Sequence, residues 1–159
     1  MQQVNINIWR NPIYFLAFGF GSGLLPKAPG TFGTLVAIPL YLLLSQLALT
    51  WYLIVTLLGL VMGIYLCEVT SRALKVHDHS GIVWDEIIGF FITMVAAPAG
   101  WLWIALGFVL FRVFDIWKPW PIKIVDKYWQ GGFGVMFDDV IAGIYAGILL
   151  QLIRIIVGD

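Results

Sequence analysis

The chain has 159 residues, of which 61% are hydrophobic and only 11% are charged. Soluble domains are usually less apolar and carry about 25% charged residues, so this composition argues against a soluble protein. Nine Lys and Arg residues balance nine Asp and Glu residues, which leaves no net positive field to attract nucleic acid. We therefore expect one membrane domain over residues 1–159, and we infer neither a nucleic acid nor a protein partner.

Four apolar stretches alternate with short polar segments that hold most of the charge. The stretches cover residues 35–49, 51–67, 87–111 and 140–157. A spanning helix needs about 20 apolar residues, or fewer when flanking side chains reach the interface. The runs are continuously apolar rather than alternating, which argues against transmembrane strands. The pattern predicts an all-α, compact, multi-spanning bundle with about three full spans and one short hairpin.

The first two stretches predict a helical hairpin that turns at Thr50. No charge lies at this junction, whereas the opposite ends carry Lys27 on one side and Arg72 and Lys75 on the other. Basic residues are enriched in cytoplasmic loops of membrane proteins. The ends that carry these three residues, and with them the motif loops, are therefore expected on the cytoplasmic face.

The third stretch is interrupted by residues 97–100, Ala-Pro-Ala-Gly, which do not favour a continuous helix. A single kinked crossing would separate Arg112 from Asp85 and Glu86 and would oppose the bias of positive charge. A hairpin that turns at Pro98 would keep them together, although each arm is only about 18 Å long, too short to span. We favour a re-entrant or tilted hairpin, and the last stretch then crosses once.

A loop rich in Gly and Pro, residues 22–34, precedes the first apolar stretch. Its glycines allow a close backbone approach, and Thr31 or Thr34 is expected to cap the following helix. A helix N-terminus beside Lys27 is suited to bind phosphate. The pattern alone is equally compatible with a rigid loop that starts a membrane helix.

A second polar segment ends in Asp85 and Glu86, directly before an apolar run. Carboxylates suit the start of a helix, but two adjacent acids at the hydrocarbon border are costly unless they are paired or bind a metal. The nearby His77 and His79 are a weak zinc signal, and we expect them in a solvated loop.

The third polar segment runs from Arg112 to Asp139 and ends in a second acidic pair, Asp138 and Asp139, expected to open the last helix. Arg112 is suited to bind two phosphate oxygens; the alternative is a snorkelling membrane anchor. Asp115 and Lys118 are expected to pair with each other.

Two further sets of residues in this segment have simpler interpretations. Lys123, Asp126 and Lys127 are interpreted as a solvated loop. Trp117, Trp120 and Trp129 are expected in an interfacial aromatic belt.

Carboxylates from two separated segments are oxygen donors, which suit Mg²⁺ or Mn²⁺. Basic groups nearby suit a phosphate. Together they predict metal-assisted phosphoryl chemistry, in which either a water or a carboxylate is the nucleophile. Two alternatives stay open: an ion-binding membrane transporter and a lipid head-group phosphotransferase.

Four segments carry a family resemblance. They are residues 26–34 (PKAPGTFGT), 82–89 (IVWDEIIG), 111–121 (FRVFDIWKPWP) and 131–139 (GGFGVMFDD). Together and in this order they resemble the phosphatidylglycerophosphatase A family. The resemblance implies an all-α, Mg²⁺-dependent phosphatase of phospholipid biosynthesis that converts phosphatidylglycerol phosphate to phosphatidylglycerol. It also implies a bacterial inner membrane location, and the bias of positive charge places the active site on the cytoplasmic face.

The resemblance also implies roles for residues of this sequence. The metal-binding acids would be Asp85, Glu86, Asp138 and Asp139, and the phosphate-binding residues would be Lys27, Thr31, Arg112 and Lys118. Asp85, Glu86 and Asp139 would be catalytic, with the choice between ligand and nucleophile left open.

Overall fold

The computed structural model describes residues 6–76 and 79–157, and all regular secondary structure within these ranges is helical. The elements are η1 (Ile8–Arg10), α1 (Pro12–Ala17), η2 (Gly19–Leu24), α2 (Pro29–Leu44), α3 (Leu49–Leu74), α4 (Trp84–Thr93), α5 (Trp101–Trp117), α6 (Ile122–Tyr128) and α7 (Gly131–Val157). The all-α prediction is confirmed.

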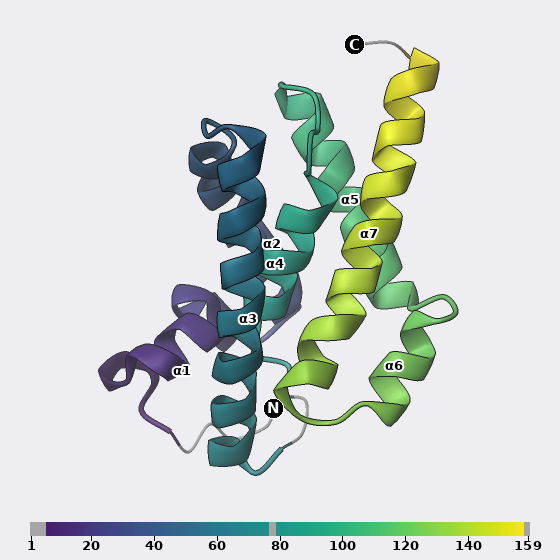
Figure 1. The fold of residues 1–159 in the computed structure, drawn as a ribbon. Helices are drawn as coiled ribbons and strands as arrows, with labels where there is room; N and C mark the ends of the chain where they lie inside the picture. The colour runs from purple at the N-terminus through teal and green to yellow at the C-terminus, as the bar shows by residue number, and fades with distance from the viewer. Residues whose placement is uncertain (1–5, 77–78, 158–159) are drawn as a thin grey trace.

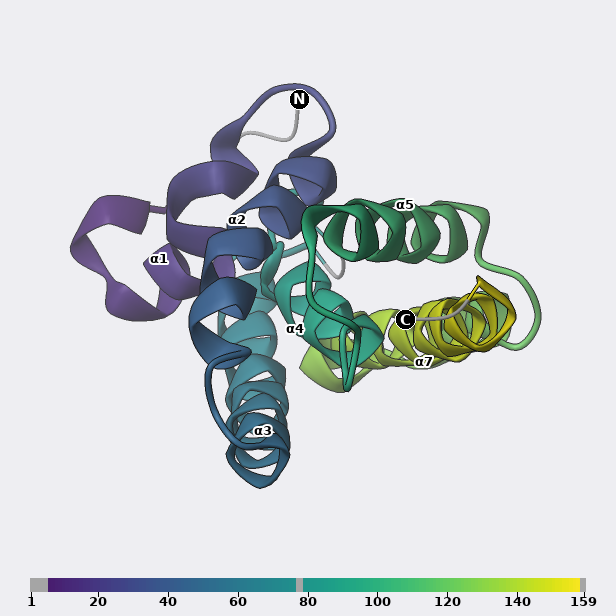
Figure 2. The ribbon, with the colours of Figure 1, turned by 90° about the horizontal axis from the view of Figure 1, so that it is seen from above.

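Five of the helices, α2, α3, α4, α5 and α7, run along one common direction and alternate in sense (Figure 1). Viewed along that direction, α4 lies between α2 and α3 on one side and α5 and α7 on the other (Figure 2). Eight of its ten residues are buried, among them Ile87, Phe90 and Phe91. The short central helix α4 is therefore the core of the bundle, which fixes the acids at its first turn.

The chain reverses between α4 and α5, as the hairpin interpretation predicted. Ala96 and Gly100 have positive φ angles of 52° and 127°, conformations that a continuing helix does not allow. The return brings Arg112 Nη1 to 3.8 Å from Glu86 Oε1. A single kinked crossing at Pro98 is therefore wrong.

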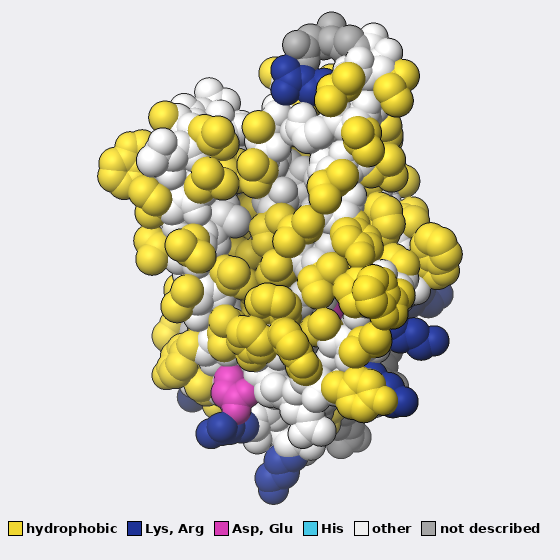
Figure 3. Space-filling model, turned by 45° about the vertical axis from the view of Figure 1, so that its right-hand side comes forward, with side chains coloured by type: hydrophobic (Ala, Val, Ile, Leu, Met, Phe, Trp, Pro, Cys, Tyr) yellow, Lys and Arg dark blue, Asp and Glu magenta, His cyan; other side chains and the backbone are white. Residues whose placement is uncertain are grey.

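Within the described residues, two helices are long and apolar enough to cross a membrane, namely α3 with 26 residues and α7 with 27. α2 is apolar but has only 16 residues, so fewer helices reach full span length than the three expected. Only 28% of the most apolar window of each long helix is buried, unlike the core helix of a soluble protein. On the face drawn in Figure 3, apolar side chains cover most of the surface, and most of the visible basic ones lie in its lower half.

Two helix boundaries differ from the sequence prediction. The turn between α2 and α3 lies at residues 45–48, so Thr50 is already inside α3. α7 begins at Gly131, so Asp138 and Asp139 lie within the helix rather than at its start. The reason is close packing, because a Cβ atom at Gly132 would collide with the backbone carbonyl of Ile64 in α3.

Candidate active site

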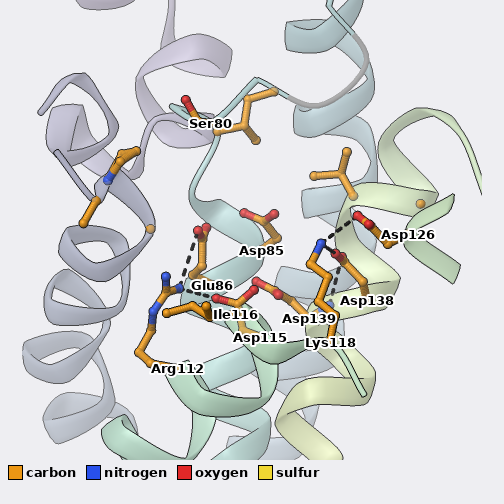
Figure 4. Close-up of a pocket in the computed structure, with 16 residues that line it drawn as sticks. Ser80, Asp85, Glu86, Arg112, Asp115, Ile116, Lys118, Asp126, Asp138 and Asp139 are labelled. Carbon is orange, nitrogen blue, oxygen red and sulfur yellow. Dashed lines mark hydrogen bonds and ion pairs between the residues drawn. The ribbon is translucent and has the colours of Figure 1, made fainter. Parts of the chain in front are cut away.

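A pocket of about 330 Å³ gathers the charged residues of four helices (Figure 4). It lies where α2 and α4 begin and α5 ends, beside α6 and the first turns of α7. Its charged lining residues are Asp85, Glu86, Arg112, Asp115, Lys118, Asp126, Asp138 and Asp139. The alternating sense of the helices produces this arrangement, because it returns each polar segment to one end of the bundle.

Three acids form the centre of the pocket. Asp85 and Glu86 lie in the first turn of α4, as predicted, and Asp139 lies in α7. One carboxylate oxygen of each lies within 4.8 Å of the other two. Asp85 and Asp139 are buried, and the Glu86 side chain is only 12% exposed. Glu86 Oε2 and Asp139 Oδ2 accept no hydrogen bond from the described residues.

The cluster is electrostatically unfavourable without a cation. Burial raises the pKa of Glu86 to about 8; the hydrogen bond with Asp85 opposes this shift, while Asp139 and Asp115 add to it. A buried carboxylate regains its charged form when an opposite charge comes close. All donors here are oxygens, and two are without partners, so the centre fits a hard divalent cation.

Arg112 lies on one side of the acids. Its guanidinium contacts Asp115, three residues further along α5, and its side chain is only 15% exposed. The snorkelling alternative is therefore wrong, because the charged group is directed into the pocket rather than toward an interface. Asp115 also interacts with the carboxyl group of Asp139. Sequence reasoning missed Asp115 as a pocket residue, although its position one turn after Arg112 was a usable signal.

Lys118 lies on the opposite side of the acids (Figure 4). Its Nζ donates to Asp138 Oδ2 at 2.7 Å and to Asp126 Oδ1 at 2.6 Å. Burial alone would lower the pKa of Lys118, but Asp138 and Asp126 raise it above its ordinary value. The expected Asp115–Lys118 pair is wrong, because Lys118 is the left-handed residue that ends α5 and turns away from Asp115.

Asp138 and Asp126 have positions that the sequence did not predict. Asp138 Oδ2 faces Lys118, and its Oδ1 accepts a hydrogen bond from the amide of Asp139 at 3.0 Å. Asp138 therefore lies beside the three-acid centre rather than within it. Asp126 belongs to α6 and lines the pocket. Like Lys123 and Lys127 on the same helix it is exposed, so these residues are solvated as predicted but lie on a helix rather than in a loop.

The Gly- and Pro-rich loop reaches the pocket through its backbone. Ala28, Pro29 and Gly30 line the pocket, whereas Lys27 is exposed and, like Thr31, is absent from the lining residues. A Cβ atom at Gly30 would collide with Glu86 Oε1 and would lie 3.0 Å from Arg112 Nη1. The predicted close approach of the backbone therefore occurs at Gly30.

The expected threonine cap of α2 is wrong. The capping position is Ala28, without a side-chain hydrogen bond. Thr34 lies inside the helix, where its hydroxyl donates to the Gly30 carbonyl at 2.9 Å. Pro29 follows Ala28 at the first helical position, and since proline has no amide hydrogen, this helix start has one unsatisfied donor fewer.

One histidine near the pocket is buried, whereas two tryptophans beside it are exposed. His77 lies outside the described residues. His79 is buried rather than solvated, and its Nδ1 accepts a hydrogen bond from the Gly81 amide at 3.0 Å. Trp117 and Trp120 are highly exposed beside the pocket, as an interfacial belt requires.

The chain is similar to known proteins over most of its length. The family model described as Phosphatidylglycerophosphatase A matches residues 15–154. A relative of that name from Escherichia coli K12 is 52% identical over 87% of this chain and 82% of its own length. Another of that name from Haemophilus influenzae is 50% identical over 91% of this chain and 90% of its own length.

A third relative has a different name. It comes from Bacteroides thetaiotaomicron, is 40% identical over 88% of this chain and 92% of its own length, and carries the provisional name phosphatidylinositol-3-phosphatase. No solved structure matches the chain significantly.

Proposed function

The chain belongs to the phosphatidylglycerophosphatase A family, and we propose that it hydrolyses the terminal phosphate monoester of phosphatidylglycerol phosphate. The products are phosphatidylglycerol and inorganic phosphate, which gives the reaction a place in phospholipid biosynthesis. The observation that carries the proposal is the pocket in which three clustered acids lie between Arg112 and Lys118.

Asp85, Glu86 and Asp139 are the proposed ligands of a Mg²⁺ ion. Two unpartnered buried oxygens and a donor set made only of carboxylates support this assignment. When bound, the ion supplies charge neutralisation of the phosphate oxygens and activation of the attacking group. Asp138 was predicted as a fourth ligand; because both of its oxygens have protein partners, we propose instead that it holds Lys118 in place.

The chain's own basic groups orient the substrate phosphate. Arg112 presents a planar fork that can bind two phosphate oxygens, and Asp115 fixes the direction of that fork. Lys118 supplies a second positive charge from the other side of the acids. Gly30 lets the backbone at the start of α2 approach the acids, while Lys27 and Thr31, just before and just after the lining residues, contribute at the rim.

The proposed membrane topology is multi-pass, in the bacterial inner membrane, with the pocket facing the cytoplasm. The accumulation of basic residues at the pocket end of the bundle supports this orientation. In a background with Cys67 replaced by Ser, Ala99→Cys should react with an impermeant maleimide only from the periplasmic side. Lys123→Cys should react only from the cytoplasmic side, and the reverse labelling would refute the orientation.

The test of the activity is release of phosphate by the purified protein in lipid nanodiscs. Phosphatidylglycerol phosphate with Mg²⁺ should give phosphate, EDTA should abolish its release, and Lys123→Ala should leave the rate unchanged. Absence of release with Mg²⁺ present would refute the proposal. Analysis of the lipid product with an added alcohol separates hydrolysis from head-group transfer.

A second substrate belongs in the same assay, because one relative carries a phosphatidylinositol-3-phosphatase name. Phosphatidylinositol 3-phosphate is also a lipid phosphate monoester, so the same pocket chemistry applies to it. We expect the larger kcat/KM for phosphatidylglycerol phosphate, since the two relatives at 50% identity or above share that name.

A further inference from the structure

An apolar groove on the outer face of α5 begins at the edge of the pocket. It has a volume of about 380 Å³ and is lined by Phe108, Val109, Arg112, Val113, Ile116 and Trp117. These positions recur at intervals of about one helical turn, so they form one continuous stripe along α5. The groove lies on the surface of the protein, where Val109 and Val113 are exposed.

The groove and the pocket are continuous, because Arg112 and Ile116 line both of them. Arg112 directs its guanidinium at Asp115 and Glu86, while its aliphatic stem is available to the apolar side. The two residues lie on one side of the acids, and Lys118 and Asp126 lie on the other (Figure 4). A molecule with a phosphate among the acids therefore has a direct apolar path past Arg112 and Ile116.

The length of the groove matches one leaflet of a membrane. From Phe108 to Trp117 the helix rises about 14 Å at 1.5 Å per residue. Half of a hydrocarbon core about 30 Å thick is about 15 Å. α5 runs between the two ends of the bundle and ends near α6 at the pocket end (Figure 1), and the groove residues 108–117 belong to the half of α5 nearest the pocket.

We propose that this groove binds an acyl chain of the phospholipid substrate and thereby orients the head group in the pocket. The proposal rests on the proposed function for its substrate. The occupant is a hydrocarbon chain attached to a phosphate, since the groove is lined by apolar side chains and joins the pocket at Arg112 and Ile116. Lipid tails are as apolar as the groove, so the groove acts by fixing the position of the lipid rather than by a hydrophobic gain.

A second apolar groove provides a matched control. It is lined by residues of α4 and α7, including Ile92, Ile144 and Ile148, and has a volume of about 460 Å³. It is larger than the groove on α5 but shares no lining residue with the pocket. If size and apolar character alone decided where a substrate chain lies, this groove would be preferred.

The kinetic test fills each groove with a bulky side chain. Val113→Trp should raise the KM for long-chain phosphatidylglycerol phosphate about tenfold, the scale of a steric misfit in a packed site, with little change in kcat. Hydrolysis of the deacylated head group should be unchanged, and Ile148→Trp should resemble the wild type with both substrates. An unchanged KM for the long-chain lipid, or an equal loss with both substrates, would overturn the proposal.

A crosslinking experiment tests whether the groove binds an acyl chain, and it does not depend on turnover. The probe is a phosphonate analogue of the substrate, not hydrolysable, with a diazirine in one acyl chain; a phosphatidylcholine diazirine serves as reference. The phosphonate should label residues 108–117 more strongly than the reference does, and should label residues 144–155 no more strongly. Equal labelling of residues 108–117 by the two probes would overturn the proposal. A wild-type protein that releases no phosphate would refute the proposed function alone.

Discussion

Gly30 shows how a single residue without a side chain defines the pocket. It stands at the start of α2, where an added Cβ atom would collide with Glu86 Oε1 and would lie close to Arg112. Neither neighbour can move freely, because Glu86 belongs to the acid cluster and Arg112 contacts Asp115. Space, rather than flexibility, is the reason for glycine at this position.

Gly30→Ala should therefore lower kcat/KM by about tenfold or more, because a displacement of about 1 Å at a catalytic group can cost that much. Gly107→Ala is a matched control, since its new Cβ atom would meet the end of the flexible Met94 side chain. Phosphate release from the two variants should differ while their thermal unfolding temperatures remain similar. Equal activity of both variants would refute the role of Gly30.

The charges of the three central acids should be required for turnover. Asp139→Asn removes one negative charge from a buried cluster but keeps its shape, so it should lower kcat about 100-fold or more. The metal-free variant should be as stable as the wild type or more so, since repulsion among the remaining acids falls. A kcat within threefold of the wild type, measured by phosphate release, would contradict the assignment.

At the scale of elements, the contact between α3 and α7 places Asp139. Gly132 packs against the backbone of Ile64 and Glu68, and its amide donates to Glu68 Oε2 at 2.6 Å. Glu68 also forms an ion pair with Arg72, one helical turn further along α3, at 2.6 Å. The first turn of α7 is thus held directly against α3, two turns before the acids that it carries.

Gly132→Ala should push these helices apart and lower both the unfolding temperature and the activity. Overpacking of this kind typically costs about 1–3 kcal/mol. Glu68→Gln retains an acceptor for the Gly132 amide and should cost less than about 1 kcal/mol, since it removes only a partly exposed ion pair. Thermal unfolding in detergent compares the two variants, and a Gly132→Ala variant with wild-type stability would refute the packing argument.

Elements whose apolar runs border polar segments were predictable from the sequence, whereas contacts between them were not. The hairpin at Pro98 and the acids in the first turn of α4 followed from local patterns and from the distribution of charge. The early start of α7 did not, because glycine runs usually indicate loops and only the contact with α3 makes a helix favourable there. The partners of Asp115, Lys118 and Asp126 depend on the direction in which α5 ends, which sequence spacing does not fix.

For the molecule as a whole, the proposed ion links the central helix α4 to the long helix α7. Asp85 and Glu86 belong to α4, and Asp139 belongs to α7, so a cation bound by all three joins these helices. A ligand that binds only the folded state stabilises it by about 2.7 kcal/mol at 100 times its dissociation constant.

Mg²⁺ should therefore raise the unfolding temperature of the wild type, and EDTA should reverse the effect. Asp85→Asn combined with Asp139→Asn should remove this response, because two of the three proposed ligands lose their charge. Differential scanning fluorimetry in detergent measures both proteins over a Mg²⁺ titration. An identical response of the double variant would show that the stabilising ion binds elsewhere.

The pocket and the groove on α5 share Arg112 and Ile116 as lining residues. This continuity also affects the release of the products of the proposed reaction. Inorganic phosphate is fully water-soluble, whereas phosphatidylglycerol stays in the bilayer, so the two products separate into different phases. The effective concentration of the lipid product is its mole fraction in the leaflet, a quantity that dilution of the aqueous phase does not change. Inhibition by product should therefore follow the composition of the membrane, and two-dimensional diffusion should set the rate at which the pocket is cleared.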